Sequence, residues 1–232
     1  MFVIIIIMDV VVMEIYVFLK YFLIFLVYSF IGWCIEVVLT LINEKKFVDR
    51  GFLLGPYCPI YGYGMLLIVF LLKDYTENAL VLFILSMVIC LLLEYMVSYF
   101  MELLFKARWW DYSNKKYNIN GRICLEYGFL FGVGGTLIMY VVHPFILSVI
   151  GNFSKVCILI LGITLLVLFI IDNVVSFNVI FKIKGFDFKD CVDNTEEISD
   201  LVKEYLIEHS RLTKRLAKAF PDVRVRIEKF KK

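Results

Sequence analysis

The chain has 232 residues, of which 62% are hydrophobic, 17% aromatic and 20% charged. Soluble domains keep closer to half of their residues apolar because they need a polar surface, so this composition excludes an ordinary water-soluble globular protein. The net charge of +2 is uninformative as a total, and no nucleic-acid partner is expected. The six cysteines show no CxxC spacing and only two histidines are present, so no disulfide framework, metal centre or cofactor is predicted.

Spanning the hydrocarbon core takes roughly 20 apolar residues, and the chain shows five candidate segments. The second is short unless it starts in the preceding loop, and Pro144 should bend or end the fourth. The predicted fold is an all-α, polytopic transmembrane helical bundle of about five helices within residues 1–181. The expected helices are 21–42, 60–72, 79–105, 124–150 and 156–181.

The first twelve residues, MFVIIIIMDVVV, are apolar but too few to span a bilayer alone. They either extend the first helix or lie at the membrane interface, and the chain could start at Met1 or at Met13. Lys and Arg are abundant after the first and third helices and in the tail, and sparse after the second and fourth. Because positive loops stay inside, we expect the N-terminus outside and the C-terminus in the cytoplasm.

The composition changes at Lys182, so residues 182–232 form a predicted cytoplasmic tail. Within it, apolar residues recur at helical spacing over 196–220, which indicates an amphipathic helix. This helix either packs on the membrane domain or docks to anionic lipid or a cytoplasmic partner.

Four glutamates stand out because an ionisable group at the bilayer centre costs about 2.5–3.5 kcal/mol on insertion scales. Glu94 and Glu102 share one helical face, and all four belong to the cytoplasmic half. Three arginines lie on the same side, so the pattern predicts a polar chamber open to the cytoplasm. The alternative is a set of ion pairs that tie helices together. The residues are Glu36, Glu94, Glu102 and Glu126, with Arg50, Arg108 and Arg122.

Two loops flank the predicted chamber. Segment 50–64 is rich in Gly and Pro, and we expect it to re-enter the membrane or line the chamber, where irregular backbone is tolerated. The second loop, 107–122, contains aromatic residues that could form an interfacial belt. Together with Arg108 they could instead stack on and pair with a charged ligand. Its candidates are Trp109, Trp110, Asp111 and Tyr112.

Four segments of the chain are distinctive: YSFIGWCIE (28–36), RGFLLGPYCPIYGYG (50–64), RWWDYS (108–113) and NINGRICLEYG (118–128). In this order they resemble the ABC-transporter type IV family of bacterial membrane proteins. The resemblance implies a permease in the bacterial plasma membrane, and it supplies no catalytic residues. No Walker A motif is present, so a separate nucleotide-binding ATPase subunit would handle ATP. Five helices are few for a permease, so a homodimer in the lipid bilayer is expected, with loop 106–122 the best candidate for contact with the ATPase.

Three functions remain open from the sequence. In a permease subunit, Glu36, Glu94 and Glu102 would line a path. In a membrane-embedded enzyme acting on a lipid or lipid-linked substrate at the cytoplasmic face, a buried Glu would be the base and arginines would hold a phosphate. In a non-catalytic assembly subunit, the charges would serve only as helix ties.

Overall fold

The computed structural model describes residues 2–45, 47–49, 51–105, 107–184 and 224–225. The all-α class is confirmed. The expected helix at 196–220 and the candidate Arg50 lie outside the described residues. The helical elements are α1 Phe2–Glu44, α2 Pro59–Leu72, η1 Lys73–Tyr75, α3 Ala79–Phe105, α4 Leu125–Leu137, η2 Ile138–Val142, α5 His143–Gly151 and α6 Lys155–Lys184. Four short strands, β1 Ala107–Arg108, β2 Asn118–Ile119, β3 Ile123–Cys124 and β4 Arg224–Val225, pair as β1 with β4 and β2 with β3.

Local chemistry explains where several helices begin. α2 starts at Pro59, whose fixed φ and missing N–H suit a first helical position. The Asn78 side chain accepts hydrogen bonds of 3.1 Å from the backbone N–H groups of Leu80 and Val81, which caps α3. Ser154 accepts one of 3.2 Å from the Cys157 N–H at the start of α6.

Four helical stretches of the described chain are long and apolar enough to cross a membrane. They are Met8–Ile42, Ala79–Leu104, Leu125–Gly151 and Lys155–Asn178. α2 has 14 residues. At 1.5 Å per residue it reaches about 21 Å, short of the roughly 30 Å hydrocarbon core. α2 alone is therefore too short to cross the hydrocarbon core. Only the irregular segment 51–58, which precedes it, could extend its path through the membrane.

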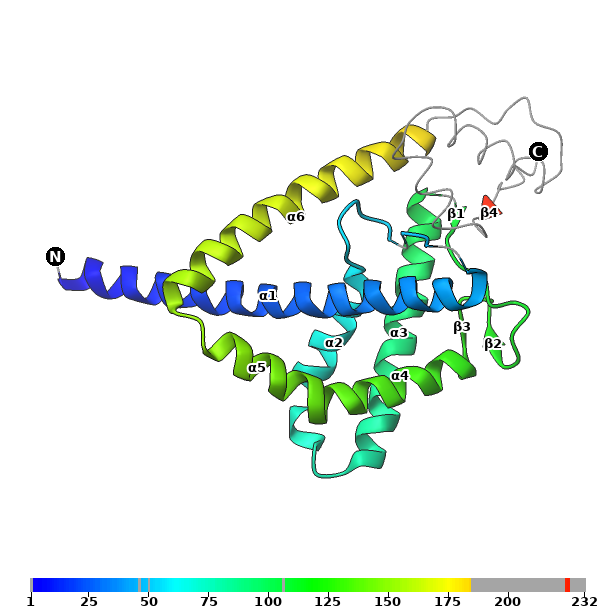
Figure 1. Ribbon diagram of the computed structural model, residues 1–232, viewed down its shortest axis with the longest axis horizontal. Coiled ribbons are helices and arrows are strands. Elements are labelled where there is room, and N and C mark those ends of the chain that lie inside the picture. The colour runs from blue at the N-terminus through cyan, green and yellow to red at the C-terminus, as the bar shows by residue number, and fades with distance from the viewer. Residues whose placement is uncertain (1, 46, 50, 106, 185–223, 226–232) are drawn as a thin grey trace.

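The predicted start of the first helix at residue 21 is wrong. α1 begins at Phe2 and runs for 43 residues without a break, so the apolar N-terminal stretch extends the helix. Lys20 interrupts the hydropathy but not the helix, because lysine is a good helix former and no Gly or Pro lies between Phe2 and Lys20. In Figure 1 the N-terminal part of α1 projects beyond the other helices.

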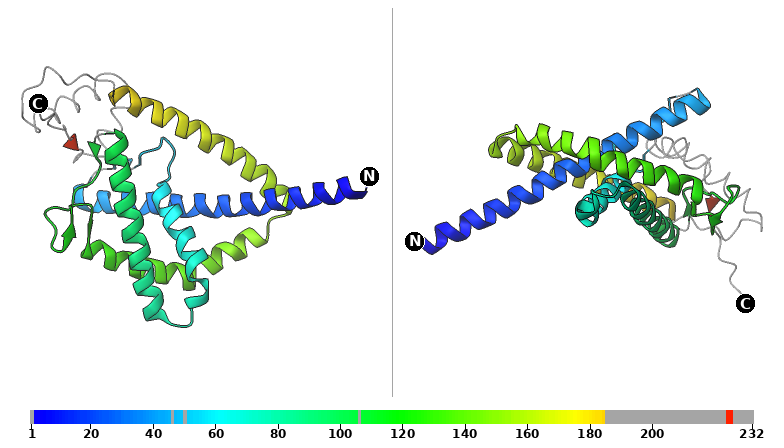
Figure 2. Two further views of the ribbon diagram at one scale, coloured as in Figure 1. Left: turned by 180° about the vertical axis from the view of Figure 1, so that it is seen from behind. Right: turned by 90° about the horizontal axis from the view of Figure 1, so that it is seen from below.

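The helices cross rather than run parallel. In Figure 1, α1 runs across the molecule with α6 on one side of it and α4 and α5 on the other, and the α2–α3 hairpin crosses them. The view from below in Figure 2 shows the hairpin almost end-on. A buried apolar core joins the helices: Leu23, Ile24, Tyr28, Met65, Ile68, Val69, Leu72, Leu82, Cys90, Met139, Ile146, Ile150 and Ile158. Many outward apolar side chains are exposed on every long helix, which fits contact with lipid.

Glycines bring α4 close to α3. A Cβ atom on Gly128 would lie 2.8 Å from Leu91, and one on Gly132 would lie 2.6 Å from Phe83. A larger residue at either position would force the Leu91 or Phe83 side chain to move, so the GxxxG pattern allows close packing as small-residue patterns do in membranes.

The fourth predicted helix bends at Pro144 and does not end there. Proline lacks an N–H and its ring clashes with the carbonyl four residues earlier, here Tyr140. The π-helical segment η2 lies directly before His143 and Pro144 and accommodates the proline, and the helix continues as α5. The change of direction between α4 and α5 is visible in Figure 1.

Candidate functional site

The segment 109–122 folds back along the C-terminal half of α3. Three of its hydrogen bonds follow the helix in order, from Ser98 toward the middle. They are Arg122 Nη1 to Ser98 Oγ at 3.1 Å, Asn120 Nδ2 to Tyr95 Oη at 3.0 Å and Tyr112 Oη to Glu94 Oε1 at 3.0 Å. This loop therefore places its polar side chains against the predicted face of Glu94, Ser98 and Glu102.

Four charged residues form the arginine cluster: Glu102, Arg108, Asp111 and Arg122. Arg122 Nη2 lies 2.8 Å and Arg108 Nε 3.1 Å from the same Glu102 oxygen. Arg108 Nη1 lies 3.7 Å from Asp111. Glu102 and Arg122 are both 6% exposed. With two positive and two negative charges, the arginine cluster is balanced, and it ties the loop to α3.

Aromatic residues complete the arginine cluster. The Arg122 guanidinium lies over the rings of Tyr95 and Tyr99, 5.7 and 5.5 Å from their centroids, a favourable cation–π arrangement. Trp110 Nε1 donates a 3.0 Å hydrogen bond to the Arg122 backbone oxygen. Trp109 is buried with its ring 5.4 Å from that of Phe52, so it joins the two predicted loops. Both tryptophans are engaged in packing the protein itself.

A second group, the carboxyl–tyrosine cluster, consists of Glu36, Glu94, Tyr61 and Tyr112. The Tyr61 hydroxyl donates to Glu36 Oε1 at 2.6 Å, and the Tyr112 hydroxyl donates to Glu94 Oε1 at 3.0 Å. The two carboxyl groups interact electrostatically with each other. No Lys, Arg or His of the described residues forms an ion pair with Glu36 or Glu94. Within the described part of the chain, the acidic groups of the carboxyl–tyrosine cluster therefore have no basic counterpart.

Glu94 is the most enclosed member of the carboxyl–tyrosine cluster. Its residue is 7% exposed, and its Oε2 atom is buried without a hydrogen-bond partner in the described structure. Burial and the negative charges of Glu94 and Glu36 raise the pKa of Tyr112 above its usual range. Tyr112 therefore stays protonated and keeps donating to Glu94.

Asp172, outside the predicted site, anchors the segment 51–58. Its carboxylate accepts backbone N–H groups from Leu54 at 2.9 Å and Gly55 at 2.8 Å. It also accepts the Tyr57 hydroxyl and, at 2.9 Å, the Ser176 hydroxyl. Segment 51–58 is irregular, as expected, so its backbone N–H groups lack helical hydrogen-bond partners. The Asp172 carboxylate on α6 accepts hydrogen bonds from two of them instead.

α1 and α2 meet beside Glu36. Ser29, Gly32 and Glu36 lie on the side of α1 that faces α2. A Cβ atom on Gly32 would lie 2.2 Å from the Tyr61 ring, and the Ser29 backbone oxygen accepts the Cys58 N–H at 2.9 Å. The glycine lets Tyr61 approach α1 closely enough to reach Glu36.

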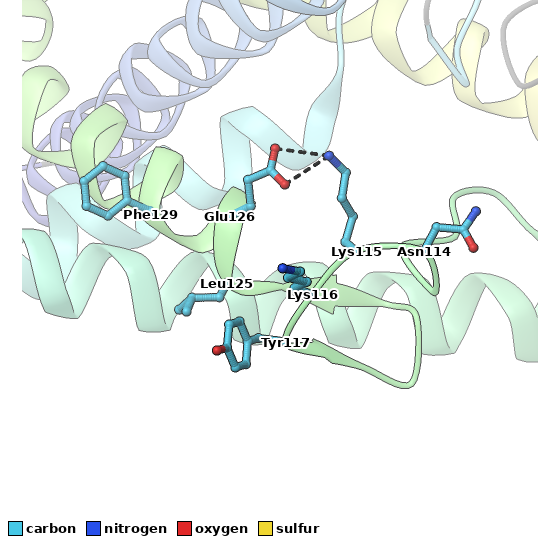
Figure 3. Close-up of a pocket in the computed structure, with 7 residues that line it drawn as sticks. All are labelled: Asn114, Lys115, Lys116, Tyr117, Leu125, Glu126 and Phe129. Carbon is cyan, nitrogen blue, oxygen red and sulfur yellow. Dashed lines mark hydrogen bonds and ion pairs between the residues drawn. The ribbon is translucent and has the colours of Figure 1, made fainter.

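A depression of about 480 Å³ lies at the surface beside the start of α4. As Figure 3 shows, Lys115 reaches both Glu126 oxygens there, at 3.1 and 3.0 Å. This pairing raises the pKa of Lys115. The Glu126 side chain is 59% exposed, so it lies outside both buried clusters. The depression is lined by Asn114, Lys115, Lys116, Tyr117, Leu125, Glu126 and Phe129.

The structure thus divides the predicted set. Glu102, Arg108, Asp111 and Arg122 meet in one cluster, and Glu36, Glu94 and Tyr112 in another. Sequence reasoning missed Tyr61 and the anchoring role of Asp172. Tyr61 lies in the first turn of α2 and within the Gly- and Pro-rich segment 50–64, which we expected to line the chamber, and that expectation was the available signal.

Helices of this length and apolarity, with polar clusters buried among them, define a multi-pass membrane protein. A family model described as Putative ABC-transporter type IV matches residues 23–177. The chain belongs to that family. No curated protein and no solved structure matches it significantly.

Proposed function

We infer that the chain is the permease subunit of a transporter that is energised by a separate ATPase chain. The observation that carries this function is the carboxyl–tyrosine cluster, in a protein of this family. Two acidic groups, the buried Glu94 and the half-buried Glu36, lie among helices without a basic partner in the described residues, which is costly in a membrane. Such groups usually mark a transport pathway or a binding site. Charges that only hold helices together occur as balanced ion pairs, as in the arginine cluster.

The proposed setting is the bacterial plasma membrane, with the N-terminus outside and the C-terminus in the cytoplasm. The distribution of Lys and Arg among the loops supports this orientation. It requires an odd number of crossings, so segment 51–58 and α2 would together make the fifth crossing. A homodimer would supply the number of helices that a permease needs.

The enzyme alternative needs arginines that can hold a phosphate. Arg108 and Arg122 both bind Glu102, so a phosphate would have to displace a buried ion pair. The assembly-subunit alternative is favoured by the same pairs, which tie loop and helix together. It offers no reason for the unbalanced Glu36 and Glu94.

The test is a mild-detergent pull-down of the tagged protein from its native host, followed by mass spectrometry. A stoichiometric nucleotide-binding ATPase is the expected result, and Glu94→Gln should leave its recovery unchanged because Glu94 is buried away from the surface. Recovery of the folded protein with bound lipid and without any ATPase would overturn the permease function and favour the enzyme.

A further inference from the structure

The starting point is the Glu94 side chain. Its Oε1 atom accepts the Tyr112 hydroxyl at 3.0 Å, while Oε2 is buried with no hydrogen-bond partner in the described structure. Glu94 lies 11 residues before Phe105, the last residue of α3. At 1.5 Å per residue this is roughly 16 Å along the helix, close to the middle of a hydrocarbon core about 30 Å thick.

An ionised carboxylate in such a place needs a cation or several donors. A buried charge without them costs several kcal/mol, and the group neutralises instead. Among the described residues, Glu94 has one neutral donor, Tyr112, and no basic partner. Among the described residues, the guanidinium groups of Arg108 and Arg122 are paired with Glu102, two helical turns further along α3, and Arg122 also donates to Ser98, one turn from Glu94.

The described groups around Glu94 do not supply the missing positive charge. From α1 the site faces Glu36, which is acidic, and from α2 it faces Tyr61, whose hydroxyl donates to Glu36. Cys90 stands one turn before Glu94 on α3 and interacts with it electrostatically. From α4, Tyr127 stacks on Tyr112 at 4.8 Å between ring centroids. Each of these groups is neutral or negative.

We propose that Glu94 binds a proton on Oε2 and that the carboxyl–tyrosine cluster is a proton-exchange site within the membrane. In the loaded state the Glu94 carboxyl is neutral, and Oε1 still accepts the Tyr112 hydroxyl. Release transfers the proton to water and leaves a carboxylate, with no other bond changed. The carboxyl–tyrosine cluster then carries one more negative charge, which attracts a cation.

The contacts also give the site a link to the surface. Tyr112 bonds Glu94 and stacks on Tyr127, and the Lys115 ammonium lies 5.8 Å from the Tyr127 ring centroid, at the depression of Figure 3. Along this series of contacts, Tyr112 and Tyr127 lie between Glu94 and Lys115.

The proposal names the ion that the permease site takes, and so deepens the proposed function, but its test needs no ATPase and no known substrate. Infrared spectroscopy of the purified full chain in lipid nanodiscs detects the C=O stretch of a protonated carboxyl group. Carboxyl-¹³C glutamate separates Glu from Asp bands. We expect one protonated glutamate band at neutral pH that disappears reversibly at alkaline pH, is absent from Glu94→Gln and remains in Glu126→Gln.

Absence of a protonated glutamate band in the wild-type chain at neutral pH would overturn the proposal, as would its persistence in Glu94→Gln or its loss in Glu126→Gln. If Glu94→Gln does not fold, Tyr112→Phe decides: losing the hydrogen bond to Oε1 should shift the band, and an unshifted band would exclude Glu94. Thermal unfolding gives an independent check. Wild-type stability should fall more at alkaline pH than that of Glu94→Gln, whose amide cannot ionise. Equal falls would contradict a proton on Glu94.

Discussion

The two buried clusters on α3 share a helix face but have opposite electrostatic characters. In the arginine cluster, Glu102 is met by Arg108 and Arg122, and every charge has a counterpart. In the carboxyl–tyrosine cluster, Glu94 and Glu36 are met only by hydroxyl groups among the described residues. Balanced charges hold a structure together, whereas unbalanced ones carry a cost that folding alone does not explain. We therefore propose that the first cluster serves stability and the second serves function.

The largest effect is expected for Arg122→Leu. It leaves Glu102 with Arg108 alone and removes the hydrogen bond to Ser98. Breaking one partner of a buried pair typically costs about 3–5 kcal/mol. Denaturant or thermal unfolding in one detergent measures the loss. A variant as stable as the wild type would show that the arginine cluster is not the tie between loop and helix.

A smaller loss is expected for Asp172→Asn. The amide keeps the shape but loses the charge that strengthens its hydrogen bonds to Leu54, Gly55 and Tyr57. A hydrogen bond to a charged group is worth about 1.5–3 kcal/mol. The same unfolding assay measures it, and limited proteolysis should show faster cleavage in 51–58. Unchanged cleavage would mean that α6 does not anchor this segment.

Tyr112→Phe is expected to cost about 1 kcal/mol, the usual net value of one hydrogen bond. The ring still stacks on Tyr127, so only the hydroxyl on Glu94 is lost. Tyr127→Phe is the matched control, because it keeps the stack without touching Glu94's hydrogen bond. If both variants lose equal stability, the hydroxyl is not the reason.

No measurable change in stability is expected for Glu126→Gln. Its pair with Lys115 is exposed at the surface, and exposed pairs contribute little. Thermal unfolding at low and high salt checks this. A clear destabilisation at both salt concentrations would show that the surface pair is part of the buried arrangement.

The sequence predicted the α-helical class and the shared face of Glu94, Ser98 and Glu102, because hydropathy and the 3.6-residue period are local properties. It could not divide the glutamates into two clusters. That division depends on the path of residues 109–122, which turn back along α3 through contacts between distant residues. The start of α1 was misplaced for a related reason. The length of an apolar run indicates which residues suit a lipid environment, but it does not mark where a helix begins. A helix can continue through a charged residue such as Lys20.

The most direct test compares Glu94→Gln with Glu102→Gln in the same detergent. The two substitutions make the same chemical change on one face of α3. We predict that Glu94→Gln is at least as stable as the wild type at neutral pH, because its amide resembles a neutral carboxyl group and, unlike Glu94, takes up no proton on folding. We also predict that Glu102→Gln unfolds at a much lower temperature, because two guanidinium groups lose their carboxylate. Equal losses, or a larger loss for Glu94→Gln, would contradict the division between a structural and a functional cluster.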